Sequence, residues 1–333
     1  MLKLFRTARP LALMLVVLVA FALWAQSGLA MIQHPPAVTP RLGAMPLYTL
    51  LLRLIPDVGL GAQLLALVML LAIALYALHV YNKHIIIKQR SAMPALMLVL
   101  VASSIVDVQR LSPALLASML ELRAIDCLFG IYSSKHPVDG AFRAGFVLAL
   151  AVLFYAPATP LVVLLFVGLL LLRPFVWREW VAALVGLLTP VMGYMLVLFL
   201  SNTPMLQGWE LFVRCLLEPT VLVVPSRLGL WGVLVGFGLP ALVALLYLPR
   251  HVDSQKIAVR KAHLLNLWVL LIMVLAFVFV PGAGWEFVIL VSIPLSLLLS
   301  DFFVSAPPSL WTRLLFALPF VGLLAVQLMP WWG

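Results

Sequence analysis

Long apolar runs fill most of this sequence, and charged residues interrupt them at only a few places. The most informative interruption is Ile105–Arg143, where acidic and basic side chains enter an otherwise apolar chain: Asp107, Arg110, Glu121, Arg123 and Asp126. Charges inside membrane-spanning segments are costly, so they indicate either function or buried pairing. This stretch therefore raises the question of whether the chain contains one polar site or several.

The composition identifies an integral membrane protein. Of the 333 residues, 65% are hydrophobic and only 10% are charged, whereas about a quarter of the residues in a soluble domain carry charge. The formal net charge is +10, but the basic residues lie in short loops between apolar runs instead of in a hydrophilic domain. Membrane topology explains that placement, so nucleic acid is excluded as a partner.

The apolar runs predict an all-α, polytopic transmembrane helical bundle of about eleven spans. The first run, Leu11–Trp24, follows Lys3, Arg6 and Arg9 and resembles a secretory signal. We expect it to be retained as a helix because further spans follow. Most of the 21 lysines and arginines fall on the side of the N-terminus. The positive-inside rule then predicts a bacterial inner-membrane protein with a cytoplasmic N-terminus and a periplasmic C-terminus.

Two short amphipathic segments do not fit a span. Residues 46–56 are an apolar piece bounded by prolines, and they are too few for a span, which needs about twenty residues. In Met205–Leu217 apolar residues recur at helical spacing, and Glu210 and Arg214 lie one turn apart. Both segments are expected as interfacial or re-entrant helices on the outer face. They leave a single membrane domain with three parts: residues 1–200, an outer amphipathic segment at 201–228, and C-terminal helical hairpins at 229–333.

The sequence lacks the motifs of soluble enzymes, namely a GxxxxGK[ST] phosphate loop, HExxH, CxxC and GxSxG. Chemistry would then depend on carboxylates of the outer side, which can act as a base or bind a divalent cation. Asp57 and Asp107 are the candidate catalytic residues. Asp107 directly follows the predicted span Met93–Val106, and Arg110 lies one turn on if the segment stays helical. No metal site and no cofactor are predicted, although a divalent cation is compatible with the carboxylates. The candidate substrate-binding residues are Arg53, Arg110, Glu210 and Arg214.

Glu121, Arg123 and Asp126 form a second group, nearer the middle of the membrane and the inner face. Arg123 and Asp126 are three positions apart and can pair along one helical face, whereas Glu121 needs a partner on another helix. Two interpretations stay open. The three residues form a structural polar network that fixes helix packing, or they line a cavity between helices.

Three motifs stand out along the first two thirds of the chain: an F-R-x-x-x-P start (Phe5, Arg6 and Pro10), a G…L-F-Y-x-P-A hairpin, and an R-P-F-x-x-R-E-W turn into a G-x-x-x-P helix, the last two within residues 140–200. In these motifs the chain resembles the domain-of-unknown-function 6427 family of Bacteroidota membrane proteins. The likeness covers the first two thirds of the chain and fades toward the C-terminus. The resemblance implies a polytopic membrane protein and brings no established activity.

A broader likeness is to the membrane glycosyltransferases called GT-C, which use polyprenyl-phosphate sugars. Their P-x-L-Y-x-L-L-L piece resembles residues 46–52, and their short helical hairpins resemble residues 145–158. In that family the first outer loop carries an acidic residue before the P-x-L-Y piece, whereas residues 26–46 of this chain contain no Asp or Glu. The resemblance thus implies the scaffold, with the catalytic acid lost or replaced.

Three functions are compatible with these features. A GT-C-like protein would handle a polyprenyl-linked or lipid substrate at the outer leaflet, with Asp57 or Asp107 as base or metal contact and arginines binding phosphate. A non-enzymatic membrane scaffold or assembly partner in the cell envelope would explain the missing loop acid, with membrane lipids and an envelope protein as partners. A transporter would need broken helices at matching positions of two repeats, and the sequence shows no clear internal repeat.

Overall fold

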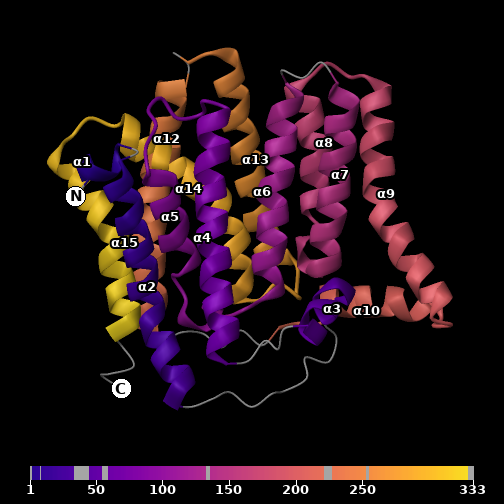
Figure 1. Cartoon of the computed structure of the whole chain (residues 1–333). Helices are drawn as coiled ribbons and strands as arrows, with labels where there is room; N and C mark the ends of the chain where they lie inside the picture. Colours follow the sequence, from indigo (N-terminus) through magenta and orange to yellow (C-terminus); the bar gives the residue numbers. More distant parts are fainter. Residues whose placement is uncertain are drawn as a thin grey trace.

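The structure, a computed structural model of the chain, describes residues 2–7, 9–33, 45–54, 59–132, 136–220, 227–252 and 255–328. In these ranges every regular element is a helix, and the long helices run side by side in one bundle (Figure 1). The predicted all-α helical bundle is therefore confirmed. The predicted catalytic residue Asp57 lies outside the described residues.

The helices have the following bounds: α1 Leu2–Phe5, α2 Pro10–Gln33, α3 Pro46–Leu54, α4 Leu60–Lys83, α5 Met93–Ala102, α6 Pro113–Ile131, α7 Pro137–Phe154, α8 Leu161–Leu172, α9 Trp177–Leu200, α10 Met205–Leu217, α11 Arg227–Val233, α12 Leu239–Val252, α13 Ile257–Phe279, α14 Val288–Ser305 and α15 Leu310–Leu328. Short turns connect some of them: the 3₁₀ turns η1 Val106–Val108, η2 Ala156–Ala158 and η4 Trp285–Phe287, and the π-helical turn η3 Leu234–Gly238.

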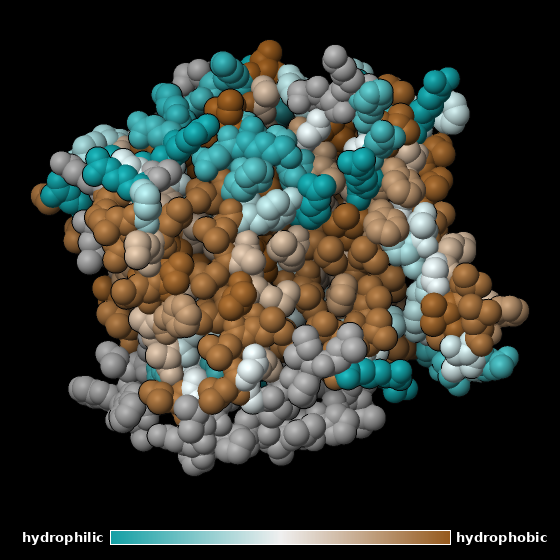
Figure 2. All heavy atoms as spheres, in the orientation of Figure 1, coloured by the Kyte–Doolittle hydropathy of each residue, from teal (hydrophilic) through white to brown (hydrophobic). Residues whose placement is uncertain are grey.

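Seven helices in the described part of the chain are long and apolar enough to cross a membrane: Pro10–Leu29, Leu60–Lys83, Pro137–Phe154, Trp177–Leu200, Leu230–Pro249, Ile257–Phe279 and Trp285–Ser305. Shorter apolar helices accompany them at Met93–Ala102, Ala156–Leu172 and Leu310–Leu324. Figure 2 shows an apolar belt across the visible face of the bundle, below a polar cap. Helix length, composition and this belt indicate a membrane-embedded, multi-pass protein.

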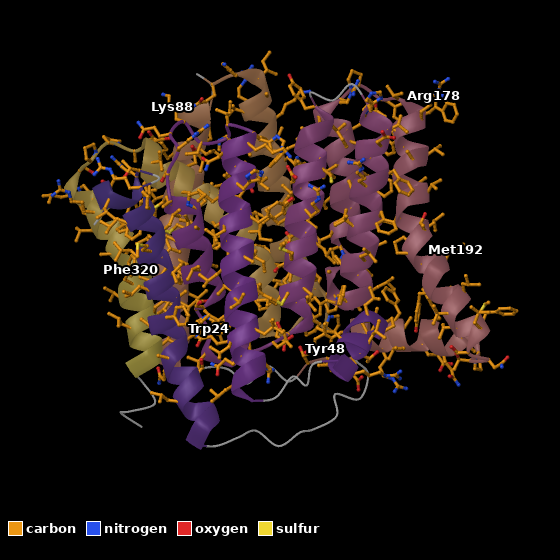
Figure 3. The ribbon with its side chains drawn as sticks, in the orientation of Figure 1. Trp24, Tyr48, Lys88, Arg178, Met192 and Phe320 are labelled. Carbon is orange, nitrogen blue, oxygen red and sulfur yellow. The ribbon has the colours of Figure 1, made fainter. Side chains whose placement is uncertain are left out.

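The two ends of the bundle differ. The polar cap of Figure 2 covers the end at which Lys88 and Arg178 lie in Figure 3, and we call it the basic end. Helices α3 and α10 lie across the opposite end (Figure 1), which we call the platform end. The two short amphipathic segments of the sequence are thus both helical and both at the same end of the molecule.

Helices α5 and α14 pack against each other inside the bundle. All ten residues of α5 are buried, as expected of a helix that is apolar all round. On α14, Ser292, Ser296 and Ser300 are also fully buried. The hydroxyls of Ser292 and Ser296 donate to the carbonyls of Ile289 and Ile293, at 2.6 and 2.7 Å. Small residues such as these let helix backbones approach closely in a membrane.

One arginine near the N-terminus caps the end of α14. Arg6 donates from Nε to the Phe303 carbonyl (2.9 Å) and from Nη2 to the Ala306 carbonyl (2.6 Å). The last carbonyls of a helix have no intrahelical partner, and a cation there also interacts favourably with the helix dipole. Burial lowers the pKa of the Arg6 guanidinium, but an arginine remains charged in proteins, so the cap is cationic.

Helices α7 and α9 contact each other backbone to backbone through two glycines. A Cβ on Gly145 would overlap the carbonyl oxygen of Ala183, and a Cβ on Gly186 would overlap that of Phe142. Such close approach requires very small residues. Pro190 lies inside α9, and after it the second half of the helix leans away from the bundle (Figure 1).

The helix that begins at Met93 ends at Ala102, earlier than the predicted Val106. Ser103 and the residues after it form turns instead, and side-chain hydrogen bonds from within this segment and from α2 hold Ser103. The Trp24 indole donates to Ser103 Oγ (2.9 Å), and the Gln109 amide donates to the Ser103 carbonyl (3.1 Å). Hydrogen bonds of this kind compete with continuation of a helix. Asp107 therefore lies in the 3₁₀ turn η1, and Arg110 does not follow it on a continuous α-helix.

Candidate functional site

The platform end holds most of the candidate binding residues, and α3 is anchored there by a tyrosine. Tyr48 is fully buried, and its hydroxyl donates to the carbonyl of Leu111 (3.2 Å), just before α6. Figure 3 places Tyr48 at the end opposite to Lys88 and Arg178. Arg53, on the same short helix, is exposed. The helix is therefore held by its apolar side, and its arginine stays available to a ligand.

Helix α10 is anchored at both of its ends. Near its start, Gly208 lies against the side chains of Tyr194 and Leu198 on α9. At its end the Leu216 carbonyl accepts a hydrogen bond from the Gly282 N–H (3.0 Å). A Cβ on Gly282 would overlap the backbone of α10, so the loop between α13 and α14 lies directly against it.

The polar residues of α10 point away from these anchors. Glu210 and Arg214 are both exposed, as are the apolar side chains Leu206 and Trp209. Burial raises the pKa of the Cys215 thiol, which disfavours the thiolate that a nucleophile needs. The platform therefore offers exposed charges and apolar surface, and its cysteine is unsuited to nucleophilic chemistry.

Arg110 has a partner that the sequence did not reveal. Its Nη2 lies 3.2 Å from Oε1 of Glu286, which is located in η4, and the two side chains are 48% and 15% exposed. A half-exposed pair of this kind contributes little stability, about 0–1 kcal/mol. The side chain of Asp107 lies outside the described residues. Arg110 is thus oriented by a residue far along the chain, and it keeps donors free for an anion.

Asp126 is the centre of a separate cluster nearer the basic end. Its carboxylate, 3% exposed, lies 2.8 Å from Lys83 Nζ, 2.8 Å from His84 Nε2 and 2.6 Å from Arg123 Nη1. The Tyr76 hydroxyl adds a hydrogen bond at 3.1 Å. The spacing of Arg123 and Asp126 indicated their contact, but the roles of Lys83, His84 and Tyr76 were missed. The cluster joins the end of α4 to α6, which is a structural task.

Glu121 does not belong to that cluster. Its side chain is fully buried, and neither of its carboxyl oxygens has a hydrogen-bond partner among the described residues. The nearby Tyr81 hydroxyl donates to the Ile293 carbonyl (3.1 Å) instead. The described residues of the other helices therefore do not supply the expected partner. A buried polar group without a partner costs about 1–3 kcal/mol, so Glu121 is not a residue that stabilises the packing.

Replacing Glu121 with an apolar residue of similar volume should therefore stabilise the protein. We expect Glu121→Met to raise the free energy of unfolding in mixed micelles by about 2 kcal/mol, because it removes two unsatisfied acceptors and leaves the volume filled. Glu121→Gln is the control, since it keeps polar atoms at the same place and should give little gain. A Met variant less stable than the native protein would show that the carboxyl has a stabilising partner after all.

A further buried acid lies near the basic end on α14. Asp301 is 2% exposed, and its Oδ2 lies 3.9 Å from Nε2 of His263, which is also buried. The Ser305 hydroxyl donates to the other carboxyl oxygen at 3.4 Å. The sequence pattern did not predict that these two residues pair, because they lie on different helices. At 3.9 Å the contact is an ion-pair distance, too long for a hydrogen bond.

The described residues contain no cluster of three or more His, Cys, Asp or Glu side chains able to hold a metal ion. The comparisons with known proteins also returned nothing. No family model, no curated protein and no solved structure matches the chain. The functional argument therefore rests on the geometry of the two ends of the bundle.

Proposed function

We propose that the chain crosses a bacterial inner membrane about eleven times, with a cytoplasmic N-terminus and a periplasmic C-terminus. The seven long apolar helices, the shorter ones and the charged helix α6 account for this number. The polar cap at the basic end, where Lys88 and Arg178 lie, supports the cytoplasmic assignment of that end. The platform end would then face the periplasm.

The proposed function is the handling of a polyprenyl-linked or other lipid substrate at the platform end, in the outer leaflet. The observation that carries it is the pair of helices α3 and α10, which lie across one end of the bundle and are each anchored by buried contacts (Figure 1). Their exposed arginines are Arg53 and Arg214, and Arg110 lies at the same end because the neighbouring Leu111 carbonyl accepts the Tyr48 hydroxyl of α3. Arginine forms bidentate hydrogen bonds with phosphate oxygens.

An apolar surface continues from this platform into the membrane. The part of α9 that leans away from the bundle exposes Met192, Leu196 and Phe199, each by more than half of its side chain. Figure 3 shows Met192 on the outer side of this helix. In a bilayer, such a surface suits the hydrocarbon chain of a lipid whose phosphate is held at the platform. The resemblance to the GT-C enzymes supports the same class of substrate.

The binding part of this proposal can be tested in nanodiscs. We expect a polyprenyl phosphate to bind the native protein and the Arg53→Gln/Arg214→Gln variant to bind it at least about tenfold more weakly. Lys256→Gln/Arg260→Gln is the control, because it removes the same charge from exposed positions at the start of α13 (the N-cap Lys256 and Arg260 in the first turn), at the basic end. Equal affinity in the native protein and in the Arg53/Arg214 variant would contradict a lipid-phosphate site at the platform.

The catalytic part needs a separate test, since Asp57 and the Asp107 side chain lie outside the described residues. If either acid is the base or metal contact, Asp57→Ala or Asp107→Ala should abolish envelope function in cells that lack the native gene. Protein levels are measured in parallel to separate lost activity from lost protein. Full function of both variants at normal levels would leave the non-enzymatic scaffold as the better proposal.

A further inference from the structure

Residues near the starts of α7 and α9 line a groove. Figure 1 shows that both helices begin at the end of the bundle opposite the platform helices α3 and α10, so the groove lies at the basic end. Its volume is about 780 Å³, within the range of about 300–1,000 Å³ that is typical of sites for small ligands. It runs directly beside the glycine contact of the two helices, where Gly186 touches the backbone of Phe142. Backbone contact at this point fixes the distance between the two walls.

The groove is lined by two cations. Arg143 on α7 and Arg178 on α9 are both exposed, and within the described ranges neither guanidinium forms an ion pair. The groove also contains a carboxylate, that of Asp139. Helices α7 and α9 both begin at this end, so their first N–H groups and dipoles add positive potential. With two arginines against one carboxylate, the groove carries a net positive charge that suits an anion.

A smaller depression of about 170 Å³ adjoins the groove and shares Phe142 and Arg143 with it. It adds Arg123, whose guanidinium is held by Asp126 at 2.6 Å and by the Tyr76 hydroxyl at 3.2 Å. Arg123 is thus preoriented by the cluster on α6. Arg143 lines both the groove and the depression. Arg178 is the second arginine of the groove, and Arg123 is the second arginine of the depression.

The remaining walls are apolar and exposed. Val138, Trp177, Val181 and Val185 line the groove with 40%, 63%, 46% and 49% of their surface exposed. Two of them, Val181 and Val185, follow Arg178 along α9 toward the middle of the apolar belt. A tryptophan at the boundary of cap and belt is typical of a membrane interface. A small soluble anion has no apolar group to contact these walls, whereas a lipid has acyl chains.

We propose that this groove binds an anionic phospholipid of the adjacent leaflet. Its phosphate would contact Arg143 and Arg178, and one acyl chain would follow Phe142, Val181 and Val185 into the membrane. Basic hollows between membrane helices on the cytoplasmic side are suited to acidic lipid headgroups. The choice of leaflet rests on the proposed topology, but the site does not depend on the proposed lipid substrate, because it lies at the other end of the bundle and uses other residues.

The test uses the full chain in detergent and measures binding of phosphatidylglycerol by native mass spectrometry. We expect the native protein to bind it, and Arg143→Gln/Arg178→Gln to bind it at least about tenfold more weakly. Two controls carry the same loss of charge: Lys256→Gln/Arg260→Gln at the same end, and Arg53→Gln/Arg214→Gln at the platform. Both should retain native affinity, which separates this site from the platform site.

Three results would overturn the proposal. Native affinity in a monodisperse Arg143/Arg178 variant would show that the groove is not the site. Equal binding of phosphatidylcholine would show that the groove does not recognise the negative charge of the lipid. Competition by inorganic phosphate at the same concentration as the lipid would show that the groove does not recognise the acyl chain. An Arg143→Lys/Arg178→Lys variant guards against misfolding, since it keeps the charge and should recover part of the affinity.

Discussion

Gly186→Ala should lower the free energy of unfolding by about 2 kcal/mol. The added methyl group would overlap the Phe142 carbonyl of α7, and overpacking of this kind costs up to about 3 kcal/mol. The better helix propensity of alanine returns about 1 kcal/mol of that. Because the obstacle is backbone and not the end of a flexible side chain, the two helices must move apart. Reversible unfolding in mixed micelles measures the change.

Gly193→Ala is the matched control for this prediction. Gly193 lies on the same helix, and a Cβ there would meet nothing within 4 Å, so only the gain in propensity of about 1 kcal/mol is expected. The two variants should thus differ by about 3 kcal/mol. Equal stability of both would show that α7 and α9 are not in backbone contact. Since that contact forms one side of the basic groove, Gly186→Ala should also weaken phosphatidylglycerol binding.

Asp126→Asn is expected to destabilise the protein by about 2 kcal/mol. The buried carboxylate receives contacts from Lys83, His84 and Arg123, and hydrogen bonds to charged groups contribute about 1.5–3 kcal/mol each. We expect a total loss near the lower end of this range, because the side chains of Lys83 and Arg123 are nearly half exposed. Water can solvate both cations when the carboxylate is removed. The same unfolding assay applies.

Asp139→Asn makes the same chemical change at an exposed position on α7 and should alter stability by less than about 0.5 kcal/mol. If Asp126→Asn behaves like this control, the cluster on α6 does not hold α4 and α6 together. Arg123→Gln should fall between the two, because Lys83 would still neutralise the carboxylate and His84 would still contact it. That order tests whether the carboxylate, and not any one cation, is the centre of the cluster.

The charges of residues 105–143 therefore serve several separate purposes. Arg110 belongs to the platform end with Glu286, Asp126 joins helices near the basic end, and Glu121 is buried without a partner among the described residues. Of the three residues interpreted as one network, Arg123 and Asp126 contact each other, and Glu121 takes no part in that contact. Their separation along α6 explains the division, since Glu121 and Arg123 point to different sides of the helix.

Local properties of the sequence were sufficient for the class of the fold. Runs of apolar residues predicted the helical membrane protein, and helical spacing in Met205–Leu217 predicted α10 at the residues where it is found. The contact of Arg123 with Asp126 also follows from spacing, because it lies within one turn of one helix. None of these features depends on which other helix is adjacent.

The tertiary structure alone decided which helix faces meet. It brought Glu286 to Arg110 across 176 residues, placed Lys83 and His84 on Asp126, left Glu121 without a partner in the described part of the chain, and formed the groove between α7 and α9. The physical reason is that lipid is about as apolar as the protein core. A membrane helix can therefore be hydrophobic on every side, and its sequence does not reveal which side is packed against protein.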